Sequence, residues 1–151
     1  MWTPACWSED EYSEEGQVIK LQQNEKLFEE IYQAFLRVYR NQSTRDEAAT
    51  YLTSVYAGYK SNTYKRYLDS FLHMMDGKQF ASVVPINLSV FLLQRIQQDF
   101  GVSALQQALA AEKLHIQYYY GVSGSSSVGL RNALQALASQ HNLQIDFSTP
   151  C

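Results

Sequence analysis

The basic residues of this chain are concentrated in one stretch, where their chemistry suits contacts with nucleic-acid phosphates and base edges. Residues 37–66 carry six Arg and Lys against two acids, a local charge of +4 in a chain of net charge −3. Helical spacing predicts two helices in residues 44–75, and in a helix-turn-helix the second such helix enters the major groove. We expect the nucleic-acid contacts of such a unit to come from Lys60, Asn62, Thr63, Lys65 and Arg66.

The interval between these two helices weakens the comparison with a helix-turn-helix. Residues 54–60 form a longer and more aromatic connection than the usual turn of about three or four residues. Basic residues near a helix start are also common on solvated surfaces, and the chain as a whole is acidic. A nucleic-acid-binding regulator that uses residues 44–75 is therefore an alternative to the function that we favour.

Arg66 and His73 form a second constellation with catalytic chemistry. Seven positions turn a helix through about 700°, so both side chains lie near one face, about 10.5 Å apart along the axis. This Arg-x6-His spacing resembles HEPN ribonucleases, all-α proteins in which Arg and His residues paired at a dimer cleft cleave RNA without a metal. The resemblance covers these two residues only, and Tyr67 stands where the family usually has a polar residue. It implies a third function, a metal-independent ribonuclease with Arg66 and His73 as catalytic residues.

Metal-ligand and nucleophile patterns are poor along the whole sequence. Glu112 and His115 give one Glu-x-x-His unit, which di-iron bundles use twice, and the second copy is absent. Cys6 and Cys151 lie at opposite ends of the chain, and no CxxC, HExxH or G-x-S-x-G occurs. We expect no metal, no cofactor and no disulfide framework, and the chain is predicted to be non-enzymatic.

Aromatic residues favour a role in protein–protein contact. Three consecutive tyrosines at 118–120 sweep about 200° of a helix, so at least one of them should be partly exposed. Further aromatic residues stand at the start of the chain, where residues 1–30 hold eight acids against two lysines. The predicted partner-binding residues are Trp2, Trp7, Tyr12, Tyr118, Tyr119 and Tyr120. The leading function is a non-enzymatic helical interaction or regulatory module, with an unknown protein or a second copy of the chain as its partner.

Apolar periodicity predicts about six helices to carry these residues. The first runs from about residue 17 to about Asn41. Thr44 and Glu47 form a capping box for the second, and Ser61 is predicted to cap the third. Gly77 is predicted to end that third helix.

Three more helices are expected in the second half of the chain. Pro85 begins one that reaches Phe100. Ser103 and Gln106 give a capping box for the next, which is expected to end near Tyr120 before a flexible serine-rich turn. Ser127 is predicted to cap the last helix.

The fold class that follows is an all-α, single compact bundle of about six helices. Its 151 residues, 46% of them hydrophobic, suffice for one domain core. We divide the chain into an irregular acidic arm at 1–16 and a helical domain at 17–151, with a short extended tail around residues 143–147 packed on the bundle. No basic-apolar leader and no run of about 18 apolar residues occurs, so we expect a cytoplasmic protein with no membrane contact.

Overall fold

Every regular element that the structure describes is an α-helix. The computed structural model describes residues 14–151, with side chains from residue 25 onward. Its elements are α2 (Glu14–Tyr39), α3 (Arg45–Val55), α4 (Ser61–Asp76), α5 (Ile86–Phe100), α6 (Val102–Ser123) and α7 (Val128–Gln140). The predicted all-α bundle of about six helices is therefore confirmed.

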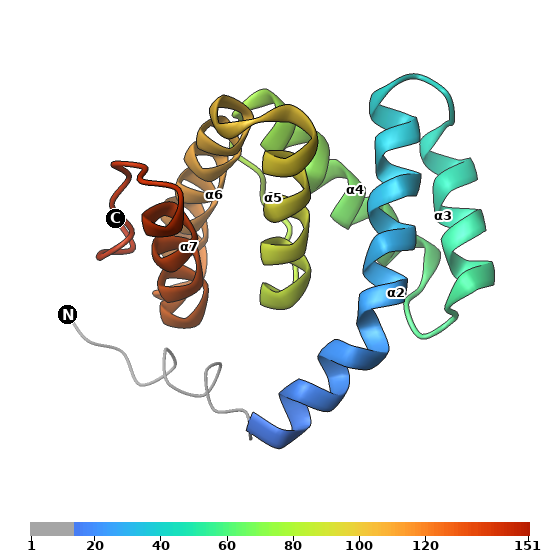
Figure 1. Ribbon diagram of the computed structural model, residues 1–151, viewed down its shortest axis with the longest axis horizontal. Coiled ribbons are helices and arrows are strands. Elements are labelled where there is room, and N and C mark those ends of the chain that lie inside the picture. Colours follow the sequence, from blue (N-terminus) through green and yellow to red (C-terminus); the bar gives the residue numbers. More distant parts are fainter. Residues whose placement is uncertain (1–13) are drawn as a thin grey trace.

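The helices form two groups that share α4. Figure 1 shows α2 and α3 as an antiparallel pair at one end of the molecule and α5, α6 and α7 together at the other. Helix α4 packs against α3 on one side and against α6 on the other, while α2 also contacts α5. The second half of the bundle is thus anchored to the first through α4 and through the α2–α5 contact.

Aromatic rings join α2 to α4 and α5 in the core. The ring of Phe71 lies 5.7 Å from that of Phe35 and 6.0 Å from that of Tyr32, and all three residues are fully buried. Phe28 packs on Phe91 of α5, with ring centroids 5.6 Å apart. Edge-to-face and tilted pairs of this kind stabilise a core beyond the apolar area they bury.

A polar contact fixes the distance between α2 and α5. The hydroxyl of Tyr32 donates to Asp99 Oδ2 over 2.7 Å, and the guanidinium of Arg95 lies 4.6 Å from the centre of the Tyr32 ring. Arg95 also forms an ion pair with Glu29. Because Tyr32 is buried, its hydroxyl needs such a partner at the edge of the core.

The capping predictions have mixed outcomes. Thr44 accepts from the Glu47 amide over 3.1 Å and Glu47 accepts from the Thr44 amide over 2.9 Å, so that capping box is confirmed. The prediction for Ser61 is wrong, because α4 has Lys60 as its N-cap residue and no side-chain cap bond. Ser103 is also not a cap, since the backbone of Gly101 (φ +94°) starts α6 one residue after α5 ends. None of α4, α6 and α7 has a side-chain cap bond at its start.

Helix α6 extends further than its sequence predicts. It passes through Gly121 and ends at Ser123, where Gly124 adopts the left-handed conformation with φ of +77°. Gly77 ends α4 in the same way, as predicted. A glycine inside a helix costs only about 1 kcal/mol relative to alanine, which packing against neighbouring helices can offset. The predicted turn therefore begins after residue 123.

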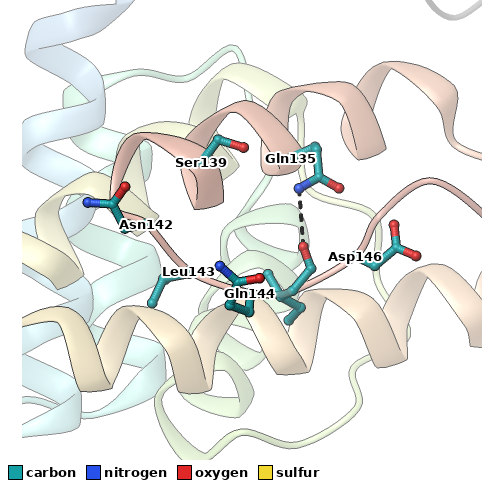
Figure 2. A pocket seen from close by; sticks show the side chains of 7 residues that line it. Gln135, Ser139, Asn142, Leu143, Gln144 and Asp146 are labelled. Atoms are coloured by element: carbon teal, nitrogen blue, oxygen red, sulfur yellow. Dashed lines mark hydrogen bonds between the residues drawn. The ribbon is translucent and has the colours of Figure 1, made fainter.

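The C-terminal residues form the predicted extended tail against α7. Phe147 is buried and its amide donates to Gln135 Oε1 over 2.9 Å, while Gln135 Nε2 donates to the carbonyl of Ile145 over 3.1 Å. Figure 2 shows the second of these bonds beside the recess between α7 and the tail. Arg131 adds a bond of 2.8 Å to the Ser148 carbonyl. The side chains of Gln135 and Arg131 thus hold the tail against α7.

Helix length and composition bear on the membrane prediction. Within residues 14–151, no helix combines the length and the apolar character that crossing a bilayer requires.

Candidate functional site

The structure keeps α3 and α4 together as a packed helix pair. Their connection, residues 56–60, is fixed by tyrosines: the Tyr64 hydroxyl donates to the Tyr56 carbonyl over 2.7 Å, and the Tyr59 ring lies 5.5–5.7 Å from the rings of Tyr56, Tyr64 and Tyr67. This cluster explains why the connection is longer and more aromatic than a common helix-turn-helix turn.

The predicted nucleic-acid contacts differ in how available they are. Lys60, Asn62 and Arg66 are exposed, while Thr63 and Lys65 are half-buried. Lys65 forms an ion pair of 2.7 Å with Asp46, and the hydrogen bond from Lys65 lowers the pKa of that carboxyl.

Two further basic side chains of this stretch are already engaged within the protein. Arg45 binds both carboxylate oxygens of Asp69, at 3.0 and 2.7 Å. Arg37 lies over the ring of Tyr51, 5.7 Å from its centre. Part of the basic concentration in the sequence is therefore neutralised or occupied in the folded chain.

Arg66 and His73 lie on the same side of α4, as their spacing predicts, and this side is exposed. Both side chains are exposed, whereas Tyr67 between them is half-buried against the tyrosine cluster. The ribonuclease chemistry of the family that they resemble depends on a dimer cleft, so their role as catalytic residues stays a prediction.

The outward side of α6 carries no charge. Its buried residues face α4, α5 and α7, and its exposed positions are Val102, Ser103, Gln106, Gln107, Ala110, Leu114, Tyr118, Gly121, Val122 and Ser123. Leu114, Tyr118 and Val122 are exposed to 38%, 37% and 65% of their surface. Ala110, Leu114, Tyr118 and Val122 follow one another at four-residue steps and form one ridge along the helix. We call these four residues the α6 ridge.

The three consecutive tyrosines differ in exposure, as expected from their angular spread around the helix. Tyr118 is exposed and belongs to the α6 ridge, while Tyr119 and Tyr120 are half-buried. The other predicted partner-binding residues, Trp2, Trp7 and Tyr12, lie outside the described residues.

Glu112 is the most unusual ionisable residue in the described part of the chain. It is 1% exposed, and its Oε2 is the one side-chain oxygen or nitrogen there that is both inaccessible to solvent and without a hydrogen-bond partner. Burial raises the pKa of Glu112 to about 8, because desolvation disfavours the carboxylate. Glu112 is therefore mainly protonated at neutral pH.

His115, one helical turn further along α6, is buried between two aromatic rings. Its ring stacks on Phe80 with centroids 4.4 Å apart and planes 8° apart, and Tyr119 covers the ring at 5.9 Å. His115 Nδ1 lies 2.7 Å from the Phe80 carbonyl. Burial lowers the pKa of His115, so the ring is neutral and its Nδ1–H donates to that carbonyl. The remaining ring nitrogen, Nε2, is then an acceptor.

His115 also lines a cavity of about 270 Å³. The cavity lies where the connection before α5, the C-terminal half of α6 and the start of α7 meet, and its lining residues are Val83, Val84, Pro85, Ile86, His115, Tyr119, Ser127 and Leu130. Sequence reasoning noticed Glu112 and His115 only as an incomplete metal motif. The four-residue run 83–86 and Ser127 carry no sequence signal that would connect them with His115.

In residues 14–151, no three His, Cys, Asp or Glu side chains gather closely enough to hold a metal ion. Comparison with protein-family models, curated proteins and solved structures finds no match to this chain.

Proposed function

We propose that the protein is a non-enzymatic helical interaction module that binds a second copy of itself through the α6 ridge. The observation that carries this proposal is the absence of any charged residue among the exposed positions of α6, a helix of 22 residues. Exposed helix faces are normally rich in Lys, Glu, Asp and Arg, whereas the centres of protein interfaces are depleted in charge.

A second copy suits this surface for a geometric reason. In a two-fold dimer each surface patch meets its own copy, so any charged residue near the axis meets a like charge. The α6 ridge has no such residue, and Lys113 is half-buried at about 100° from Leu114 around the helix. Ridges of four-residue spacing also interdigitate when two helices cross at about −50°.

The dimer expected from this contact is weak and concentration-dependent. A helix of this length spans about 33 Å, and one helix pair buries less area than the roughly 1,600 Å² of a standard stable interface. Sedimentation velocity of the full chain across the micromolar range should show a monomer that becomes a dimer as concentration rises.

Charge placed on the ridge tests the location of the contact. Leu114→Glu and Tyr118→Glu should each abolish the dimer, because two carboxylates would be buried near the axis. Val55→Glu is the matched control, since Val55 is an equally exposed apolar residue on α3. A wild-type chain that stays monomeric at every concentration contradicts self-association. If Val55→Glu loses the dimer and the two α6 variants keep it, the contact lies on α3 and not on the α6 ridge.

A second candidate function is nucleic-acid binding by α3 and α4. Asn62 and Arg66 are exposed one turn apart near the start of α4, and neither forms an ion pair or side-chain hydrogen bond with any other described residue. Asn and Arg are the side chains that most often read adenine and guanine in the major groove.

Fluorescence anisotropy with labelled duplex DNA and single-stranded RNA tests this candidate. The affinity should fall as salt concentration rises: for duplex DNA, the logarithm of the binding constant should fall by about 0.9 per phosphate contact for each tenfold rise in salt. The affinity should be lower still in Lys60→Ala/Arg66→Ala. Lys26→Ala/Lys78→Ala makes the same charge change at exposed positions elsewhere and serves as the control. No binding at low salt, or equal losses in both double variants, excludes a specific role for α4.

A further inference from the structure

The cavity beside His115 has the walls of a small-molecule site. Five of its lining residues are aliphatic or proline, Tyr119 adds an aromatic wall, and none is charged while His115 is neutral. Its volume of about 270 Å³ exceeds the roughly 150 Å³ in which an engineered apolar cavity binds benzene. The space therefore fits a molecule of about one aromatic ring with a small substituent.

Two buried polar side chains face this cavity with hydrogen-bonding capacity left over. His115 is 2% exposed and its Nδ1 is used by the Phe80 carbonyl, but no described residue bonds to its Nε2. Ser127 is 8% exposed, and no described residue bonds to its hydroxyl. Ser127 precedes α7, where a serine side chain would ordinarily cap the helix, yet no such cap bond forms. Both groups are thus available to a ligand in the cavity.

From this geometry we infer that the cavity binds a neutral, one-ring aromatic molecule that carries a hydroxyl group, of the phenol class. Its ring lies between Tyr119 and the aliphatic wall formed by residues 83–86 and Leu130. Its O–H donates to His115 Nε2, and its oxygen accepts from the Ser127 hydroxyl. A carboxylate is disfavoured, because no lining residue supplies a compensating positive charge.

The rigid mounting of His115 supports this assignment. The stack on Phe80 and the bond from Nδ1 fix both the orientation and the tautomer of the ring, so Nε2 is held as an acceptor before any ligand arrives. Preorganised groups of this kind add affinity because little ordering remains to be done on binding. Val83, at 51%, is the one exposed residue among the described residues that line the cavity, so we place the mouth of the cavity beside it.

The test is a titration of the full chain, isotopically labelled, with phenol, benzene and benzoate, followed by amide chemical shifts. Phenol should bind with shifts concentrated at residues 83–86, 115, 119, 127 and 130. It should bind about 30-fold more tightly than benzene, as expected for two additional hydrogen bonds, and benzoate should bind least.

Two variants separate the cavity from other sites. Val83→Trp should block the mouth and abolish phenol binding, whereas Val55→Trp makes the same change on α3 and should leave binding unchanged. His115→Phe keeps an aromatic ring beside Phe80 and should reduce the preference for phenol over benzene to that of the one remaining hydrogen bond, from Ser127. Absence of phenol binding, equal binding of phenol and benzene to the wild type, or unchanged binding in Val83→Trp would each overturn the inference. Dimerisation through the α6 ridge is measured separately and does not depend on these outcomes.

Discussion

The imidazole of His115 is both stacked on the ring of Phe80 and hydrogen-bonded to the Phe80 carbonyl. The two rings are 4.4 Å apart with planes 8° apart, and Nδ1 lies 2.7 Å from the carbonyl oxygen. These two contacts join residues 35 positions apart and attach the connection between α4 and α5 to α6. The position of His115, which lines the cavity, therefore depends on its contacts with Phe80.

Phe80→Ala should destabilise the protein by about 3–5 kcal/mol, the usual cost of deleting a buried aromatic ring. Phe80 is 3% exposed and is the main apolar anchor of residues 78–84. The loss can be measured as a change in the free energy of unfolding by urea denaturation. Val83→Ala, in the same connection but half exposed, should change it by less than about 0.5 kcal/mol. Similar losses in both variants would show that Phe80 does not anchor the connection.

Stability should fall as pH rises because of Glu112. In the folded protein its pKa is about 8, and its ordinary value is 4.5. Between these values the folded state holds a proton that the unfolded chain has released, so the free energy of unfolding decreases with pH. This contribution is fully present below about pH 4.5 and is lost by about pH 8. Between these two pKa values the free energy of unfolding should fall by on the order of 1 kcal/mol per pH unit.

Glu112→Gln should remove that slope and should be more stable than the wild type at the alkaline end of the range. Thermal denaturation at a series of pH values gives the comparison. His115 acts in the opposite sense, because its lowered pKa makes stability fall as pH drops below 6.5. The difference between variant and wild type therefore isolates Glu112. Glu25→Gln, an exposed change, should retain the wild-type slope, and an unchanged slope in Glu112→Gln would contradict the burial of an uncharged carboxyl.

Tyr32→Phe should cost roughly 1–2 kcal/mol of unfolding free energy. The hydroxyl donates to Asp99 over 2.7 Å, and bonds to charged groups are stronger than neutral ones, although Asp99 is partly exposed. Burial, and then this hydrogen bond, raise the pKa of Tyr32. Tyr39→Phe, on the same helix but exposed, should have little effect in the same urea experiment. Equal stability of Tyr32→Phe and wild type would mean that the bond to Asp99 contributes nothing net.

Thr44→Ala and Ser61→Ala should differ although the sequence gives both residues the same role. Thr44 forms a complete capping box, so its loss should cost about 1 kcal/mol. Ser61 is the first residue of α4 and makes no cap bond, so Ser61→Ala should be nearly neutral. Chemical denaturation of the two variants side by side measures the difference. A larger loss of unfolding free energy in Ser61→Ala than in Thr44→Ala would show that Ser61 caps α4 after all.

The candidate sites show where sequence reasoning succeeds and where it stops. The i, i+7 spacing of Arg66 and His73 places both on one face of α4, because periodicity within one helix determines relative direction, and the structure shows that this face is exposed. The spacing says nothing about Asp46, which lies in another helix and pairs with Lys65. Likewise, the angular spread of the three tyrosines predicts that at least one is exposed, but only the tertiary structure decides that it is Tyr118 and that the exposed positions of α6 around it carry no charge.

The sequence by itself determined the all-α class, the capping box at Thr44 and the end of α4 at Gly77, because each depends on interactions within a few residues. It also predicted the extended tail, but the bonds that hold the tail join it to Gln135 and Arg131, 10 to 17 positions away. Tertiary structure decided that Glu112 is buried without a partner, that His115 is locked against Phe80, and that Val83 and Ser127 share a cavity with it. Burial and long-range contact depend on how helices pack, and one helical pattern is compatible with many packings. These features therefore depend on contacts between residues that are far apart in the chain.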